Sequence, residues 1–251
     1  MKNMVVRPDQ MPDWMERVAK LFREIFQQLW RGFLEPGKGL SLEQLQLFVE
    51  HRNPFEVAQT AISGRFDKLK KEWQKFYKQV FNLDADFPNL TIPAKRDVFN
   101  WLIIMLQGLT AQKLYDRCKE LFGAWRWVDK SLDEVLDQTK SARNPANGTC
   151  AIWIRDRVEA DEELKNKSAN DLKQENIQGI TLEERLLLEL FYWWKTKKHL
   201  DIDNRTLCSG SRCVGGVVPY VHWRRFYDRL DVRWSYPVDA YDRLRSRQAV
   251  S

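Results

Sequence analysis

A chain of 251 residues, 43% of them hydrophobic, can form one large domain, or a small and a medium one, around a substantial core. Four cysteines are too few for a disulfide framework at this length. The N-terminus has no apolar segment typical of a secretory signal, and no apolar run approaches the roughly 20 residues that span a bilayer, so we expect a cytoplasmic protein without membrane partners.

Helical patterns begin near the N-terminus. Asp13 is a candidate cap for a helix whose apolar positions recur every three to four residues through Leu29. Ser41 and Gln44 have the spacing of a capping box and predict a second helix, which Asn53 and Pro54 end.

A third apolar face predicts a helix from about Phe66 to Phe81. We therefore assign residues 1–88 to a helical N-terminal region.

The middle of the chain alternates strand and helix signals. The run from Val98 to Leu106 suits a buried strand, with a helical turn as the alternative. Thr110 is placed to cap a helix over residues 111–122. A strand over residues 124–128 and a short helix capped by Ser131 follow.

Further along, residues 149–154 are rich in β-branched side chains and predict another strand. The charged piece from Asp156 to Asn170 is expected to be a solvated helix or loop. Thr181 and Glu184 predict the start of a strong helix that runs to about Lys198, and residues 199–204 are expected to be a linker.

The C-terminal segment predicts an antiparallel pair of strands, Val218–Trp223 and Leu230–Tyr236. Successive side chains of a strand point to opposite faces. We expect Trp223 and Trp234 to be buried on the apolar face, which also contains Val221, Leu230 and Val232. The opposite, exposed face is expected to carry Tyr220, His222, Asp231, Arg233 and Ser235.

Charge is concentrated in this segment. The whole chain carries +6, whereas the residues from Arg205 to Ser251 include nine arginines, four aspartates and no lysine or glutamate, a charge of +5. Arginine, tyrosine, tryptophan and serine make rigid or adaptable contacts and are typical of binding surfaces.

Motifs of catalysis are not found. The sequence contains no Gly-x-Ser-x-Gly, His-Glu-x-x-His or Walker-type motif. The glycine-rich stretch from Ser209 to Gly216 precedes no helix pattern and is expected to be a turn between strands rather than a phosphate cradle. The carboxylates of residues 156–163 are interpreted as a solvated face. We expect a non-enzymatic protein without a cofactor.

A metal site is also not expected. His199, Cys208, Cys213 and His222 are of the types that bind zinc, but their spacing does not match the paired ligands of structural zinc sites.

Two binding functions remain open. The polar strand face and its loops could recognise a protein or a glycan, or the arginines and aromatic rings could bind nucleic acid. Four aspartates in the same segment weaken the nucleic-acid interpretation, for which we expect at most weak, non-specific binding. Arg245 and Arg247 are interpreted as structural residues that pair with aspartates. The candidate binding residues are Tyr220, His222, Arg224, Phe226, Tyr227, Asp231, Arg233, Ser235, Tyr236 and Tyr241.

The resemblance of this chain to a known family depends on a set of C-terminal residues, which we call the frame positions. They are Leu207–Arg212, Gly216, Val218, Pro219, Val221, Trp223, Val232, Trp234, Pro237 and Leu244–Val250. With the body residues 39–46 and 154–160, this frame resembles bacterial proteins that have a near-constant body and a hypervariable C-terminal end. Such ends resemble those of the variable proteins of diversity-generating retroelements, which display changeable residues on a C-type-lectin-like scaffold to bind ligands.

The resemblance implies an α+β chain in which a helical N-terminal region precedes a C-type-lectin-like domain over residues 89–251, with a C-terminal antiparallel sheet and a variable end at 205–251. The Glu-Pro-Asn and Trp-Asn-Asp motifs of calcium-dependent lectins are absent from the sequence, so calcium-mediated sugar binding is not expected. The residues between the frame positions are then the changeable positions. They are Cys213, Val214, Val217, Tyr220, His222, Arg224–Asp228, Asp231, Arg233, Ser235, Tyr236 and Val238–Tyr241.

Overall fold

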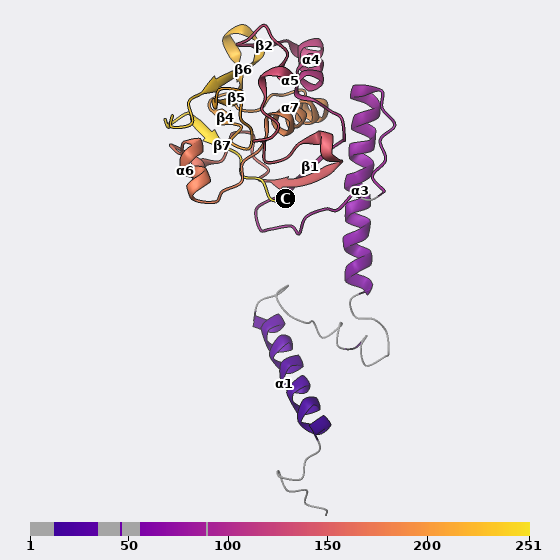
Figure 1. Ribbon diagram of the computed structural model, residues 1–251. Helices are drawn as coiled ribbons and strands as arrows, with labels where there is room; N and C mark the ends of the chain where they lie inside the picture. The colour runs from indigo at the N-terminus through magenta and orange to yellow at the C-terminus, as the bar shows by residue number, and fades with distance from the viewer. Residues whose placement is uncertain (1–12, 35–45, 47–55, 89) are drawn as a thin grey trace, which may run out of the picture. The chain divides into compact units, whose positions relative to one another are not determined.

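A computed structural model describes residues 13–34, 46, 56–88 and 90–251 (Figure 1). The chain divides into two compact units, Met1–Lys68 and Leu69–Ser251. Within the described parts of the chain, helices and two β-sheets give a mixed α+β architecture. No helix among these residues is long and apolar enough to cross a membrane.

The helix predicted from Asp13 is present as α1 (Asp13–Leu34). The capping residues and the stop of the second predicted helix lie outside the described residues. The third predicted helix is present as α3 (Glu56–Phe81), which begins ten residues earlier than the apolar pattern indicated. The unit boundary falls within α3, so its last turns belong to the second unit.

These last turns of α3 pack on a two-stranded sheet. The Trp73 indole donates to the Leu102 carbonyl at 3.1 Å, and the Tyr77 hydroxyl donates to the Ile104 carbonyl at 2.6 Å. Both carbonyls belong to β1 (Trp101–Met105), which pairs antiparallel with β3 (Cys150–Ile154). Both strands match the sequence prediction, and nearly all of their side chains are buried.

The helices of the second unit begin where their caps predict. The Thr110 side chain accepts from the Lys113 amide at the start of α4 (Ala111–Phe122), and Ser131 caps α5 (Leu132–Val135). Thr181 and Glu184 form a reciprocal capping box at the start of α7 (Leu182–Thr196). Side chains on many sides of α7 are buried, and the helix packs on α4, β1 and β5. It is therefore the central helix of the second unit.

The second sheet has the strand order β2-β6-β5-β4-β7. Its strands are β2 (Ala124–Arg126), β4 (Arg205–Leu207), β5 (Val218–Arg224), β6 (Arg229–Ser235) and β7 (Leu244–Ser246). The antiparallel pairing of β5 with β6 confirms the predicted hairpin. The outer pairs, β2 with β6 and β4 with β7, are parallel.

One face of this sheet contacts α4 and α7. Val221, Trp223, Leu230 and Val232 are buried there, as predicted. Trp234 is 38% exposed, so its predicted burial is wrong. It lies one residue before the end of β6, opposite Pro219, and its ring contacts Tyr236.

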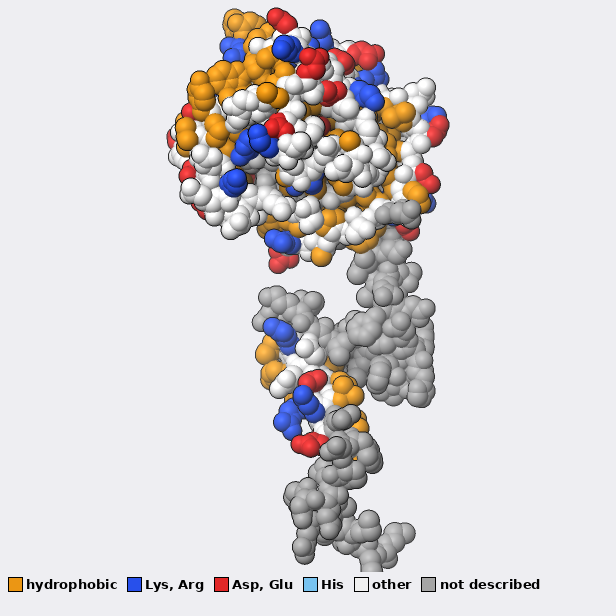
Figure 2. All heavy atoms as spheres, viewed as in Figure 1, with side chains coloured by type: hydrophobic (Ala, Val, Ile, Leu, Met, Phe, Trp, Pro, Cys, Tyr) orange, Lys and Arg blue, Asp and Glu red, His pale blue; other side chains and the backbone are white. Residues whose placement is uncertain are grey.

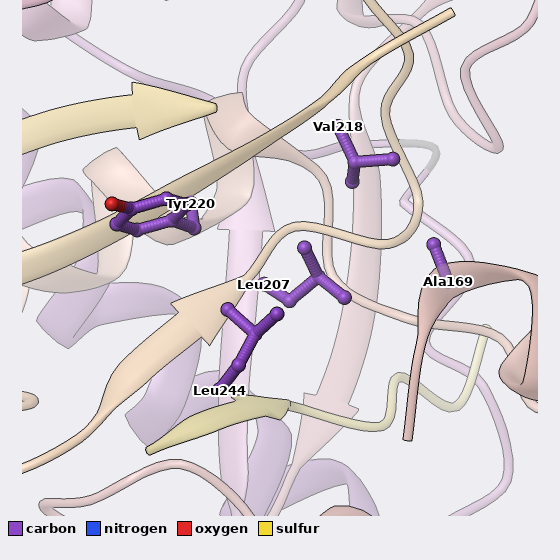
Figure 3. Close-up of a cluster of buried hydrophobic side chains, with 5 residues drawn as sticks. All are labelled: Ala169, Leu207, Val218, Tyr220 and Leu244. Carbon is purple, nitrogen blue, oxygen red and sulfur yellow. The ribbon is translucent and has the colours of Figure 1, made fainter. Parts of the chain in front are cut away.

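The opposite face is partly covered, contrary to the expectation of a fully exposed surface. Ala169 of α6 (Ala169–Gln174) packs with Leu207, Val218, Tyr220 and Leu244 in a second small core, and Tyr241 packs against it (Figure 3). This core lies over β4, β7 and one end of β5, so the open part of the face lies on β5, β6 and β2.

A buried network of charges fixes the C-terminal segment to the rest of the unit. Arg185 and Glu189 of α7 pair with each other at 2.8 Å, and Arg185 also pairs with Asp201 at 2.8 Å. Arg247 pairs with Asp201 at 2.7 Å and donates to the carbonyls of residues 157 and 158. Burial acts to raise the pKa of Asp201, but Arg247 and Arg185 outweigh it, so this pKa is lowered.

The structure tests the roles that were predicted for Arg247, Arg245 and the linker. The structural role predicted for Arg247 is confirmed, whereas Arg245 pairs with Glu162 rather than with an aspartate. Residues 199–204 were expected to be a simple linker, but Leu200 and Asp201 are fully buried.

The acidic stretch after β3 is not a solvated face throughout. Asp161 is 1% exposed, pairs with Arg155 at 2.6 Å and accepts from the Gln248 amide. Glu159 accepts from the backbone amides of residues 202 and 204. The buried Asp161 and the half-buried Glu159 therefore connect the loop after β3 to distant segments of the chain.

Candidate functional site

The predicted binding residues of β5 and β6 lie on one face of the sheet. His222 is opposite Asp231, Tyr220 is opposite Arg233, and Ser235 is opposite Val218. Neighbours on the same face of paired strands lie roughly 5 Å apart, so these residues form one contiguous surface.

Their exposure differs from the prediction at three positions. Tyr220 is 8% exposed because the second small core covers it, and Ser235 is buried with its hydroxyl donating to Asp239 at 2.7 Å. Asp231 is fully buried because arginines surround it. Within the strand pair, the partly exposed residues of this face are His222, Arg233 and the two end residues Arg224 and Arg229.

Three arginines converge on Asp231, and we call them the arginine cluster. Arg229 donates to the Asp231 carboxylate at 2.9 Å, Arg233 at 3.2 Å and Arg224 at 3.3 Å. Charge-assisted hydrogen bonds of this kind are among the strongest that side chains make. Three positive charges thus share one negative charge, and the arginine cluster together with Asp231 has a net charge of +2.

Aromatic rings hold the same guanidinium groups in place. The guanidinium carbon of Arg233 lies 4.7 Å from the ring centroid of Trp125, and that of Arg229 lies 5.2 Å from it. The guanidinium carbons of Arg224 and Arg229 lie 4.5 and 4.8 Å from the ring centroid of Tyr227. Cation–π contacts at these distances restrict the arginines to defined orientations.

Trp125 and Arg229 were not among the predicted site residues. Trp125 lies on β2, and its backbone is in register with Asp231. The parallel pairing of two strands so far apart in sequence gives no local signal. Arg229 lies at the first position of β6, where the alternation assigns it to the face of Asp231 and Arg233, so the same rule, extended by one step, would have included it.

His222 stays neutral within this positive environment. Burial, followed by the charge of Arg205, lowers the pKa of His222 from 6.5 to about 4. Its Nδ1 is buried and has no hydrogen-bond partner among the residues that the structure describes. The imidazole therefore adds a polar group, but no charge, at neutral pH.

The loop between β5 and β6 projects aromatic side chains. It forms a 3₁₀ turn, Arg225–Tyr227, and then Asp228 adopts the left-handed conformation (φ 47°). Phe226 is 87% exposed and Tyr227 is also exposed, with their rings 5.0 Å apart. A phenylalanine this exposed contributes little to folding and is available for contact with a ligand.

A second set of exposed apolar side chains follows β6. Tyr236, whose ring contacts Trp234, and Val238 are exposed. Figure 2 shows hydrophobic side chains gathered at the upper left of the second unit, where Figure 1 places β5 and β6. Such exposed apolar groups next to charged ones are typical of interaction surfaces.

Tyr241 has a different role from the one predicted. Its hydroxyl accepts from Arg205 at 2.9 Å, and it packs on the second small core. Arg205 lies 5.5 Å from the ring centroids of both Tyr220 and Tyr241. These contacts make Tyr241 a partly buried support of the surface.

The glycine-rich stretch is a turn between β4 and β5, as expected. Gly210 approaches the main chain of residues 179 and 180 so closely that an added Cβ would lie 2.5 Å from the Gly179 carbonyl oxygen.

Cys213, a changeable position, is fully buried.

The four residues weighed for zinc have other partners or surroundings. His199 stacks on Trp223 and contacts Glu189, and Cys208 is buried. Across the described ranges, no group of three or more His, Cys, Asp or Glu side chains is placed to hold a metal ion.

Comparisons of this chain with protein-family models, with curated proteins and with solved structures find no match.

Proposed function

We propose that this protein is a non-enzymatic recognition protein that displays a variable binding surface on β5, β6 and their loops. In this proposal residues 89–251 form a C-type-lectin-like domain, similar to the variable proteins of diversity-generating retroelements. The ligand is a protein or a glycan.

The burial of the C-terminal segment carries the proposal. Frame and changeable positions were separated by resemblance alone, without reference to structure. Most frame positions are buried, including Leu207, Val221, Val232 and the segment around Arg247, whereas most changeable positions are exposed or half-buried. A display surface requires this division, because changeable residues must not contribute to the core.

The exceptions concern residues with a defined local role. Trp234 is an exposed frame position. Cys213, Tyr220, Asp231 and Ser235 are buried changeable positions. Substitutions at these four positions would have to preserve small-core packing or the arginine contacts, so the proposal expects narrower variation there than at Phe226 or Tyr236.

The nucleic-acid alternative receives less support. Of the nine C-terminal arginines, Arg212 donates to backbone carbonyls, Arg245 pairs with Glu162 and Arg247 belongs to the buried network. The +5 charge is therefore divided between structure and surface, and does not form a continuous basic groove of the kind that follows a phosphate backbone.

Deep sequencing of this gene from many cells of its source population tests the proposal. We expect substitutions to concentrate at the changeable positions and to spare the frame positions. Substitutions spread evenly over the chain would overturn it.

A further inference from the structure

We propose that the arginine cluster binds the carboxylates of an acidic protein segment that also presents an apolar side chain. This inference rests on the recognition function proposed above and names the chemistry of its partner.

The charge balance of the cluster is the first argument. Arg224, Arg229 and Arg233 share the single carboxylate of Asp231, which is fully buried and cannot present its charge to a ligand. The side chains of the three arginines are 28–38% exposed. The outward side of the cluster is therefore positive and favours an anion.

Preorganisation is the second argument. Each guanidinium has five N–H donors, and the contacts with Asp231 use only some of them. Cation–π contacts hold Arg229 and Arg233 on Trp125, and Arg224 and Arg229 on Tyr227. A planar carboxylate matches the fork of donors on arginine, and little rotamer entropy is lost when it binds.

The surroundings favour separate carboxylates over a continuous chain of phosphates. Asp228 is exposed in the same loop as Tyr227, and Arg225 lies 4.0 Å from the exposed Asp203. A long polyanion that crossed the cluster would meet these acidic groups at its edge. The exposed ring of Phe226 beside them suits an apolar side chain of a peptide instead.

Selection from a library of random peptides displayed on phage tests this inference with the full chain. We expect the enriched peptides to combine aspartate or glutamate with an apolar residue. The tightest peptide, synthesised, should bind Arg233→Gln at least 10-fold more weakly than the wild-type chain.

Arg243→Gln is the matched control. It removes the same charge from an exposed position before β7, at the far edge of the sheet from β6. This variant should bind the peptide as the wild-type chain does. Equal melting temperatures of the two variants would show that the loss in Arg233→Gln is not unfolding.

The outcomes separate the two proposals. Enriched peptides without acidic residues, whose binding Phe226→Ala abolishes, would overturn the acidic partner and leave the recognition face supported. Tighter binding of a single-stranded oligonucleotide or of heparin than of the acidic peptide would also overturn the carboxylate assignment. A library without any enriched peptide would overturn the acidic partner, whereas the recognition function, which also admits a glycan ligand, is decided by the sequencing experiment.

Discussion

Replacing Arg247 by methionine should destabilise the second unit strongly. The guanidinium makes four contacts: with Asp201 at 2.7 Å, with the carbonyls of residues 157 and 158 at 2.8 Å each, and with the Thr206 hydroxyl at 3.1 Å. Without it, the single positive charge of Arg185 has to pair with two buried carboxylates, Asp201 and Glu189. Removal of one partner from a buried ion pair costs about 3–5 kcal/mol.

The matched control is two residues away. Arg245→Met removes a guanidinium that pairs with Glu162, whose side chain is 62% exposed. Although the Arg245 side chain is only 13% exposed, its partner carboxylate is open to solvent, and a solvent-screened pair contributes about 0–1 kcal/mol. Urea titration of both variants at pH 7 gives the two free energies of unfolding. A loss below about 1 kcal/mol in Arg247→Met, or equal losses in both variants, would refute the role of the buried network.

Three further predictions concern the sheet and its surface. The pKa of His222 is lowered to about 4, so the unfolded chain binds a proton more readily between pH 6.5 and 4. The free energy of unfolding should therefore fall as the pH drops through this range. Between pH 7 and pH 4.5, the melting temperature of the His222→Gln variant should fall less than that of the wild-type chain. Gly210→Ala should cost about 1–3 kcal/mol, because its Cβ would meet main-chain atoms at 2.5 Å, and an unchanged melting temperature would contradict the observed packing. Binding to DNA in gel shifts should be weak, non-specific and lost near about 0.15 M salt, whereas sequence-selective binding that survives about 0.2 M salt would favour the nucleic-acid function.

Local patterns were sufficient to predict most elements. The caps Thr110, Ser131 and Thr181 mark the helix starts because each satisfies backbone amides within its own first turn. The alternation in β5 and β6 predicts which side chains share a face, because this depends only on the strand itself.

The same patterns do not predict what covers a face. Tyr220 was expected to be exposed and is buried, because Ala169 and Tyr241 reach it from other parts of the chain. Trp234 was expected to be buried and is exposed. It lies near the end of β6, where the pairing with β5 extends only one residue further, to Ser235. Burial depends on tertiary contacts that periodicity does not contain.

Charged residues show the same limit. Arg247 was expected to pair with an aspartate, but its partner Asp201 lies 46 positions away in a segment that was expected to be a linker. Trp125 reaches the site only because β2 pairs with β6. The site was therefore predictable as a face and a loop, but not as an arginine cluster around one buried carboxylate.

Positions 205–251, in our proposal, divide into a buried frame and a replaceable surface. Saturation mutagenesis of this segment in the full chain, with protease resistance as the measure of folding, tests it most directly. We predict that Phe226, Tyr236 and the other exposed changeable positions accept nearly all substitutions, while Val221, Val232 and Arg247 accept few. Equal tolerance at both classes of position would contradict the account.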